Sequence, residues 1–99
     1  MIDPIESREV RINGVTCHIA LYDDPDSTAM DADCYSAEDI ACWLTGHWGY
    51  VTAEVRTTFG RASVSGVEYG CMPHATIGLD SIVESHGRDL LGEAYGVTS

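Results

Sequence analysis

The tightest constraint on the fold is Asn13-Gly14, which lies between two runs of alternating apolar residues in EVRINGVTCHIALYD. Asn-Gly is a preferred pair for a two-residue hairpin turn, because both residues tolerate positive φ. After the turn, apolar residues recur at every second position and share one face of a strand: Val15, Cys17, Ile19 and Leu21. The stretch predicts an antiparallel hairpin that follows a polar, mobile segment at residues 1–8.

The next run, TAMDADCY at residues 28–35, also alternates, with Asp31 and Asp33 on the face opposite its apolar residues. Matching the apolar faces of the two strands predicts a register in which paired residue numbers sum to 51. The expected pairs are Leu21 with Met30, Ile19 with Ala32, Cys17 with Cys34, His18 with Asp33 and Ala20 with Asp31. We expect Cys17 and Cys34 to be neighbouring thiols, with a disulfide as the alternative.

Ser36 is predicted to begin a helix, because a hydroxyl residue followed three positions later by a carboxylate, here Asp39, forms a capping box. Glu38 and Asp39 then lie in the first helical turn, where the helix dipole favours negative charge. Apolar spacing predicts that one face packs on the sheet, and Gly46 is the expected stop. The packing residues are Ile40, Trp43, Leu44 and, less regularly, His47.

The remaining chain predicts two more strands and a helical C-terminus. WGYVTAEVRTTF alternates and is interpreted as a central strand, whereas residues 61–72 predict a shorter edge strand with a bulge at Gly66 and a break at Pro73. Helical spacing of apolar residues begins at Leu79. This segment is expected to form either one C-terminal helix or two short helices divided at Gly87 and Gly92. The predicted fold is one α+β domain, residues 1–99, with an antiparallel sheet of three to five strands.

The charge pattern limits the partners of this domain. Its formal net charge is −11, from 16 acids and five Arg, and no Arg lies between Arg11 and Arg56. Binding to nucleic acid needs a cationic surface, so direct binding is not expected, whereas a partner with a basic surface is compatible. Acidity also favours solubility, so a solvated surface is the alternative. The acidic N-terminus and the lack of a long apolar run predict a cytoplasmic protein without a membrane partner.

Metal and catalytic motifs are incomplete. Asp24, Asp26 and Thr28 have the alternate spacing of calcium ligands, but Ala29 and Tyr35 occupy the positions that need Gly and Glu. A zinc site would need a second tight pair beside Cys71 and His74, and Cys42 with His47 does not supply one. The adjacent Ser85 and His86 should point in different directions, and no orienting third group is evident. We therefore expect no metal, no cofactor and no enzymatic activity.

Three segments resemble a pattern found in small uncharacterised proteins of actinobacterial phages and mobile elements: YSAEDIACW followed by HWGYV, then GVEYG, then ATIGLD. The resemblance covers about Tyr35 to Tyr95, although ATIGLD lacks the tryptophan of that family, and it implies no established activity. The hairpin before a helix with Ser36, Glu38 and Trp43 also resembles phage-encoded anti-CRISPR proteins. Many of those are small acidic domains that occupy the basic nucleic-acid channel of a host complex.

Charge and resemblance together predict an inhibitor of a host nucleic-acid-binding defence complex, with a CRISPR–Cas subunit as the expected partner. Trp48 and Tyr50 are expected to be exposed anchors, whereas Trp43 belongs to the core. The alternatives are a virion or assembly protein and a small metal-dependent enzyme or regulator, and a homodimer is left open. The predicted partner-binding residues are Asp23, Asp24, Asp26, Asp31, Asp33, Glu38, Trp48 and Tyr50.

Overall fold

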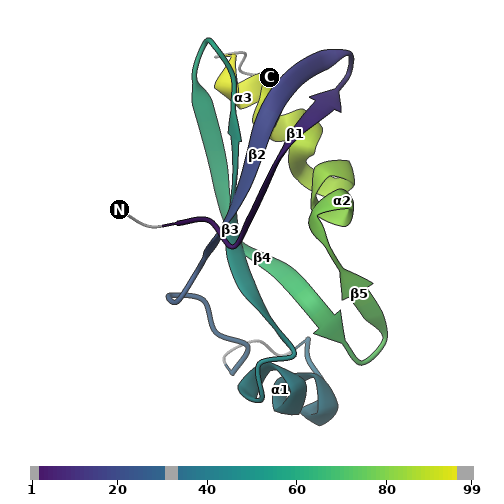
Figure 1. Cartoon of the computed structure of the whole chain (residues 1–99). Helices are drawn as coiled ribbons and strands as arrows, with labels where there is room; N and C mark the ends of the chain where they lie inside the picture. The colour runs from purple at the N-terminus through teal and green to yellow at the C-terminus, as the bar shows by residue number, and fades with distance from the viewer. Residues whose placement is uncertain (1–2, 31–33, 96–99) are drawn as a thin grey trace.

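The computed structural model of the chain describes residues 3–30 and 34–95 and confirms an α+β fold (Figure 1). Five antiparallel strands follow one another in the sheet in chain order, and a helix is inserted between the second and third. The strands are β1 Glu6–Ile12, β2 Val15–Asp23, β3 Trp48–Arg56, β4 Arg61–Met72 and β5 Ala75–Ile77. The helices are α1 Ala37–Leu44 and the successive C-terminal segments α2 Leu79–Ile82, η1 Val83–Gly87 and α3 Arg88–Ala94.

The first hairpin forms as predicted, with Asn13 and Gly14 both at positive φ in the turn. The strand before it is longer than expected, because β1 begins at Glu6, which lies opposite Leu21. Residues 6–8 of the segment predicted to be mobile therefore belong to the sheet. The sheet is curled, since the hydroxyl of Tyr69 on β4 donates a hydrogen bond to Glu6 on β1, with 2.9 Å between the oxygens.

The predicted strand at residues 28–35 is wrong, and so is its register with β2. Thr28–Met30 lies outside any strand, Asp31 and Asp33 lie outside the described residues, and β2 pairs with β3 instead. The physical reason is that alternation marks the apolar face of a strand but not its partner. The strand β3 supplies buried Val51, Ala53 and Val55 to the sheet, whereas Met30 is 59% exposed. The observed neighbours are Leu21 with Ala53, Ile19 with Val55, Ala20 with Glu54, His18 with Arg56 and, through β1, Cys17 with Val10. Cys17 is buried and Cys34 is exposed, both as free thiols, so their predicted pairing does not form.

The helix α1 begins with the predicted capping box. The Ser36 hydroxyl accepts a hydrogen bond from the Asp39 backbone N–H, and the Asp39 carboxylate accepts one from the Ser36 N–H, both at 3.1 Å. Gly46, at positive φ, follows the helix as expected. The packing face is smaller than predicted, because Leu44 is 65% exposed and His47 is exposed.

β4 is the longest of the described strands rather than a short edge strand, and it lies between β3 and β5. The predicted bulge is present, because the pairing shifts from Val51 opposite Val67 to Ala53 opposite Val64 and Gly66 has a φ of 71°. β5 was not predicted; it pairs only with the end of β4, from Gly70 to Met72. On the side away from β3, the part of β4 before Gly70 therefore has no strand beside it among the described residues.

The C-terminal segment stays helical through both glycines, and η1 is a π-helical turn between the two α-helical pieces. Gly87 does not break the helix because it provides close packing: a Cβ there would lie 3.0 Å from Cδ1 of Ile12. Leu79, Ile82, Leu90 and Leu91 cover the main core of the sheet. A smaller core at the other end joins Ala29, Trp48 and Met72 to the apolar side of α1.

Candidate functional site

The predicted acidic face is divided in the structure. Asp23, Asp26 and Glu38 are exposed, Asp24 is buried, and Asp31 and Asp33 lie outside the described residues. Asp23 ends β2, Asp26 lies in the turn after it, and Glu38 lies in the first turn of α1. Three of the four predicted carboxylates that the structure describes are thus exposed, and they lie on a strand end, a turn and a helix rather than on one strand.

Asp24 has a structural role. It is 9% exposed, and its Oδ2 accepts hydrogen bonds from the backbone N–H of Gly66 at 2.7 Å and from the hydroxyl of Ser27 at 2.9 Å. These hydrogen bonds, led by the one from Gly66, hold the pKa of the Asp24 carboxyl below its ordinary value. The Asp24 N–H also donates to the carbonyl of Tyr50 on β3. Asp24 therefore holds the chain that leaves β2 against β3 through its N–H and against the bulge of β4 through its carboxylate.

Trp48 and Tyr50 are not the exposed anchors that the sequence predicts. Trp48 is 3% exposed, and its indole N–H donates to the carbonyl of Asp39 at 2.9 Å. Tyr50 is partly buried and packs edge-on against Trp48. Trp43, predicted to be core, is only partly buried. The spacing of apolar residues along α1 correctly predicts that one side of the helix is apolar. It does not predict that Trp48, the first residue of the strand after Gly46, points inward.

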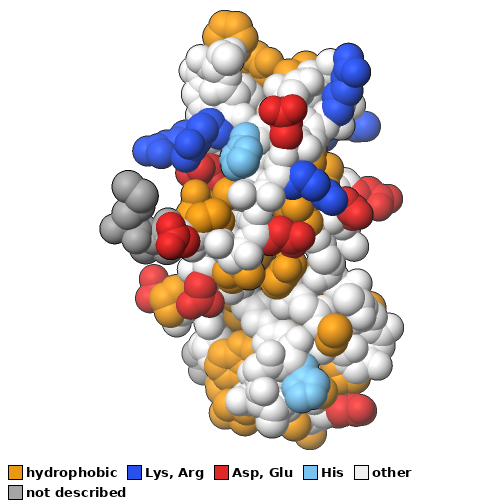
Figure 2. Space-filling view, viewed as in Figure 1, with side chains coloured by type: hydrophobic (Ala, Val, Ile, Leu, Met, Phe, Trp, Pro, Cys, Tyr) orange, Lys and Arg blue, Asp and Glu red, His pale blue; other side chains and the backbone are white. Residues whose placement is uncertain are grey.

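The positive charges are segregated. All five arginines lie at the end of the sheet that holds the β1–β2 and β3–β4 turns: Arg8 and Arg11 on β1, Arg56 and Arg61 beside the β3–β4 turn, and Arg88 at the start of α3. We call the opposite end the cation-free end; it comprises the described residues of 23–51 and 66–77. Figure 2 shows Arg side chains only over the upper part of one face, whereas acidic and His side chains lie in both the upper and the lower parts of that face.

Apolar side chains accompany the acids at the cation-free end. Met30 is 59% exposed and Leu44 is 65% exposed, whereas Asp24 and Asp39 are buried. The exposed surface there combines Asp23, Asp26 and Glu38 with two large apolar groups. Mixed surfaces of this kind are compatible with protein interfaces, where apolar anchors are surrounded by polar groups.

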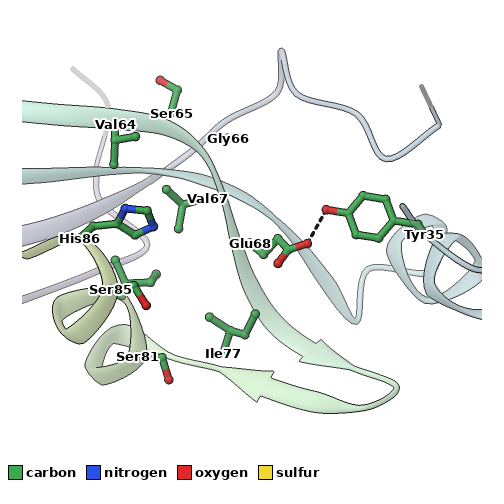
Figure 3. A pocket seen from close by; sticks show the side chains of 11 residues that line it. Tyr35, Val64, Ser65, Gly66, Val67, Glu68, Ile77, Ser81, Ser85 and His86 are labelled. Atoms are coloured by element: carbon green, nitrogen blue, oxygen red, sulfur yellow. Dashed lines mark hydrogen bonds between the residues drawn. The ribbon is translucent and has the colours of Figure 1, made fainter. Parts of the chain in front are cut away.

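A groove of about 290 Å³ runs along the open edge of β4, between that strand and the C-terminal helical segments (Figure 3). Val64 and Glu68 of β4 line one wall, Ser81, Ser85 and His86 line the other, and Tyr35 closes one end. Ser85 and His86 were predicted to diverge. Both line this groove from the π-helical turn η1.

Glu68 is held by a short chain of hydroxyl groups. The Tyr50 hydroxyl donates to the Tyr35 hydroxyl at 2.9 Å, and Tyr35 donates in turn to Oε2 of Glu68. Burial, followed by the hydrogen bond to Glu68, raises the pKa of Tyr35, so its phenol keeps its proton to higher pH than an ordinary tyrosine does. Neither Tyr35 nor Glu68 was predicted as a site residue from the sequence. The one available signal was that Glu68 is the single charged residue in the stretch 62–72.

Other site classes find little support in the described residues. They contain no group of three or more His, Cys, Asp or Glu side chains placed to hold a metal ion. Of the residues weighed for zinc, His74 has its Nδ1 3.7 Å from Oδ1 of Asp39. None of the described helices is long and apolar enough to span a membrane.

The fold and the groove define a small, acidic α+β domain whose arginines gather at one end while its acids lie at both ends. Comparison with protein-family models, with curated proteins and with solved structures finds no match. The resemblance to phage and mobile-element proteins therefore stays a prediction, and a function must be argued from geometry and charge.

Proposed function

We propose that this protein is a phage or mobile-element inhibitor that binds the basic surface of a host nucleic-acid-binding defence complex through its cation-free end. The expected target is a CRISPR–Cas effector. The observation that supports the proposal is the segregation of charge: all five arginines lie at one end of the sheet, away from Asp23, Asp26 and Glu38.

The direction of that segregation matters for docking on a basic channel. A channel that holds phosphates presents Arg and Lys, so a cation at the docking end would repel it, whereas carboxylates attract it and speed association. Exposed acids alone would give a weak, salt-sensitive complex, because surface ion pairs contribute about 0–1 kcal/mol each. Met30 and Leu44 supply apolar area at the same end for a stable complex.

Two charge-reversal variants with equal net charge test this proposal. The first carries Asp23→Lys, Asp26→Lys and Glu38→Lys at the cation-free end. The matched control carries Glu9→Lys, Asp89→Lys and Glu93→Lys, which are exposed and lie on β1 and α3. Each variant is compared with the wild-type protein for binding to a panel of purified CRISPR–Cas effector complexes, at two salt concentrations and with competing target DNA.

We expect wild type to bind at least one effector, with binding weakened by salt and displaced by DNA. The first variant should lose affinity by about tenfold or more, because each reversal replaces an attraction by a repulsion, and the control should stay within about threefold. Equal losses in both variants would mean that only total charge matters and would contradict the proposal. Absence of binding to every effector, together with self-association of the wild type at micromolar concentration, would favour an assembly protein instead.

A further inference from the structure

The groove beside β4 contains one formal charge. Glu68 is the only Asp, Glu, Arg or Lys among the residues that line it, and Tyr35 and Tyr50 fix the orientation of its carboxylate. Among the described residues, Oε2 of Glu68 accepts a hydrogen bond and no protein donor reaches Oε1. A partly buried carboxylate with a free oxygen is stabilised by a cationic donor, because charge-assisted hydrogen bonds are stronger than neutral ones.

The walls of the groove suit a long cationic side chain. Val64, Ile77 and Ile82 supply apolar surface along which a methylene stem can lie, while the Ser81 and Ser85 hydroxyls can accept hydrogen bonds. The volume of about 290 Å³ is at the lower limit of pockets for small molecules, so it fits one side chain better than a cofactor. Guanidinium presents five donors in a planar fork and is less strongly hydrated than ammonium, which favours arginine over lysine.

We propose that the groove between β4 and the C-terminal helix receives an arginine side chain of the partner, with Glu68 as its counter-ion. Tyr35 is a positioning residue, because its hydroxyl orients the carboxylate from the far end of the groove. The inference rests on the proposed function for the identity of the partner, but the arginine site itself can be tested without one.

The test is a titration of the full-length, isotope-labelled protein with N-acetyl-arginine amide, followed by amide NMR shifts. N-acetyl-citrulline amide, which has nearly the same shape without the charge, is the control ligand. We expect saturable shifts at Glu68, Ser85 and His86 with the arginine compound and weaker or no shifts with the citrulline compound. Shifts of equal size with both ligands, or no saturable shift with arginine, would overturn the inference.

Variants locate the site. Glu68→Gln should weaken arginine binding by about tenfold, since it removes the charge-assisted contact and keeps the shape. Glu84→Gln is the matched control, because it removes the same charge from η1 at a residue that does not line the groove, and it should leave binding unchanged. Tyr35→Phe should weaken binding by a few-fold while leaving the charge in place. Equal affinity of Glu68→Gln and Glu84→Gln would contradict the assignment.

A steric variant keeps the test decisive if Glu68→Gln disturbs folding. Ser85 is exposed at the groove wall, so Ser85→Leu should fill the groove, block arginine and leave the thermal unfolding midpoint near that of wild type. The outcomes for the two proposals are separable. Effector binding that survives Glu68→Gln and Ser85→Leu would overturn the arginine groove alone, whereas arginine binding without binding to any effector would overturn the proposed function alone.

Discussion

The indole N–H of Trp48 donates a hydrogen bond to the backbone carbonyl of Asp39, with 2.9 Å between the two heavy atoms. This bond joins the first residue of β3 to the first turn of α1, and the same Asp39 closes the capping box with Ser36. Trp48 also contacts Tyr35 in a tilted arrangement and Tyr50 edge-on, at centroid distances of 5.2 and 5.4 Å. One tryptophan thus fixes the position of the helix and supports the two tyrosines that orient Glu68.

Replacing this tryptophan should destabilise the domain far more than replacing the other one. We expect Trp48→Phe to lower the free energy of unfolding by about 2–3 kcal/mol, because it removes buried volume and the indole hydrogen bond to the Asp39 carbonyl. Trp43→Phe, at a partly exposed position, is the control and should cost less than about 1 kcal/mol. Urea denaturation of both variants measures the difference, and similar losses would contradict the role assigned to the hydrogen bond.

Asp24 should make the free energy of unfolding depend on pH in the acidic range. Its folded-state pKa is lowered, mainly by the hydrogen bond from Gly66, so ionised Asp24 favours the folded state. That contribution is full above the unfolded-state pKa of aspartate and is lost as the pH falls through the lowered folded-state pKa. The Asp24→Asn variant should therefore have a lower urea midpoint of unfolding than the wild type at pH 7. The difference between the two midpoints should be smaller at the most acidic pH at which both proteins still fold. A gap that is the same at both pH values would contradict this.

Gly70 should be the glycine at which alanine does the most damage. Its φ is 122°, and a Cβ there would lie 2.7 Å from the carbonyl oxygen of His47 and from Cα of Trp48. We expect Gly70→Ala to cost about 2–4 kcal/mol, from backbone strain together with overpacking. Gly49→Ala is the control, because Gly49 pairs in the neighbouring strand and has no atom within 4 Å of the added Cβ. Thermal unfolding compares the two, and equal melting temperatures would refute the predicted clash.

The Tyr35 phenol should resist ionisation. Burial and the hydrogen bond to Glu68 raise its pKa, so the neutral phenol is favoured in the folded protein. Its stabilising effect is therefore present below the unfolded-state pKa of tyrosine and is lost as the pH rises through the raised folded-state pKa. In an absorbance titration at alkaline pH, Tyr35→Phe should leave the number of tyrosines that ionise near pH 10 unchanged. Loss of one ionisation from that range would show that Tyr35 titrates normally.

Local signals predicted several elements correctly. Asn13-Gly14 forms the first turn, Ser36 and Asp39 form the capping box, and Gly66 marks the bulge in β4. Each depends on the chemistry of two to four neighbouring residues, so it can be recognised without knowing the rest of the fold. The candidate groove could not be recognised in this way, because Tyr35, Glu68 and Ser85 come from three separate segments and η1 departs from α-helical spacing.

Local residue chemistry was enough to predict where the chain turns, where a helix is capped and how much charge the protein carries. The partner of β2, the burial of Trp48 and the gathering of the arginines at one end depend on contacts between distant segments. Period-two alternation fixes the buried face of a strand but does not name its partner, because pairing is a competition among segments distant in the chain. Here β2 pairs with β3 and not with the strand predicted at residues 28–35, and the Asp24 carboxylate accepts a hydrogen bond from the Gly66 N–H of β4.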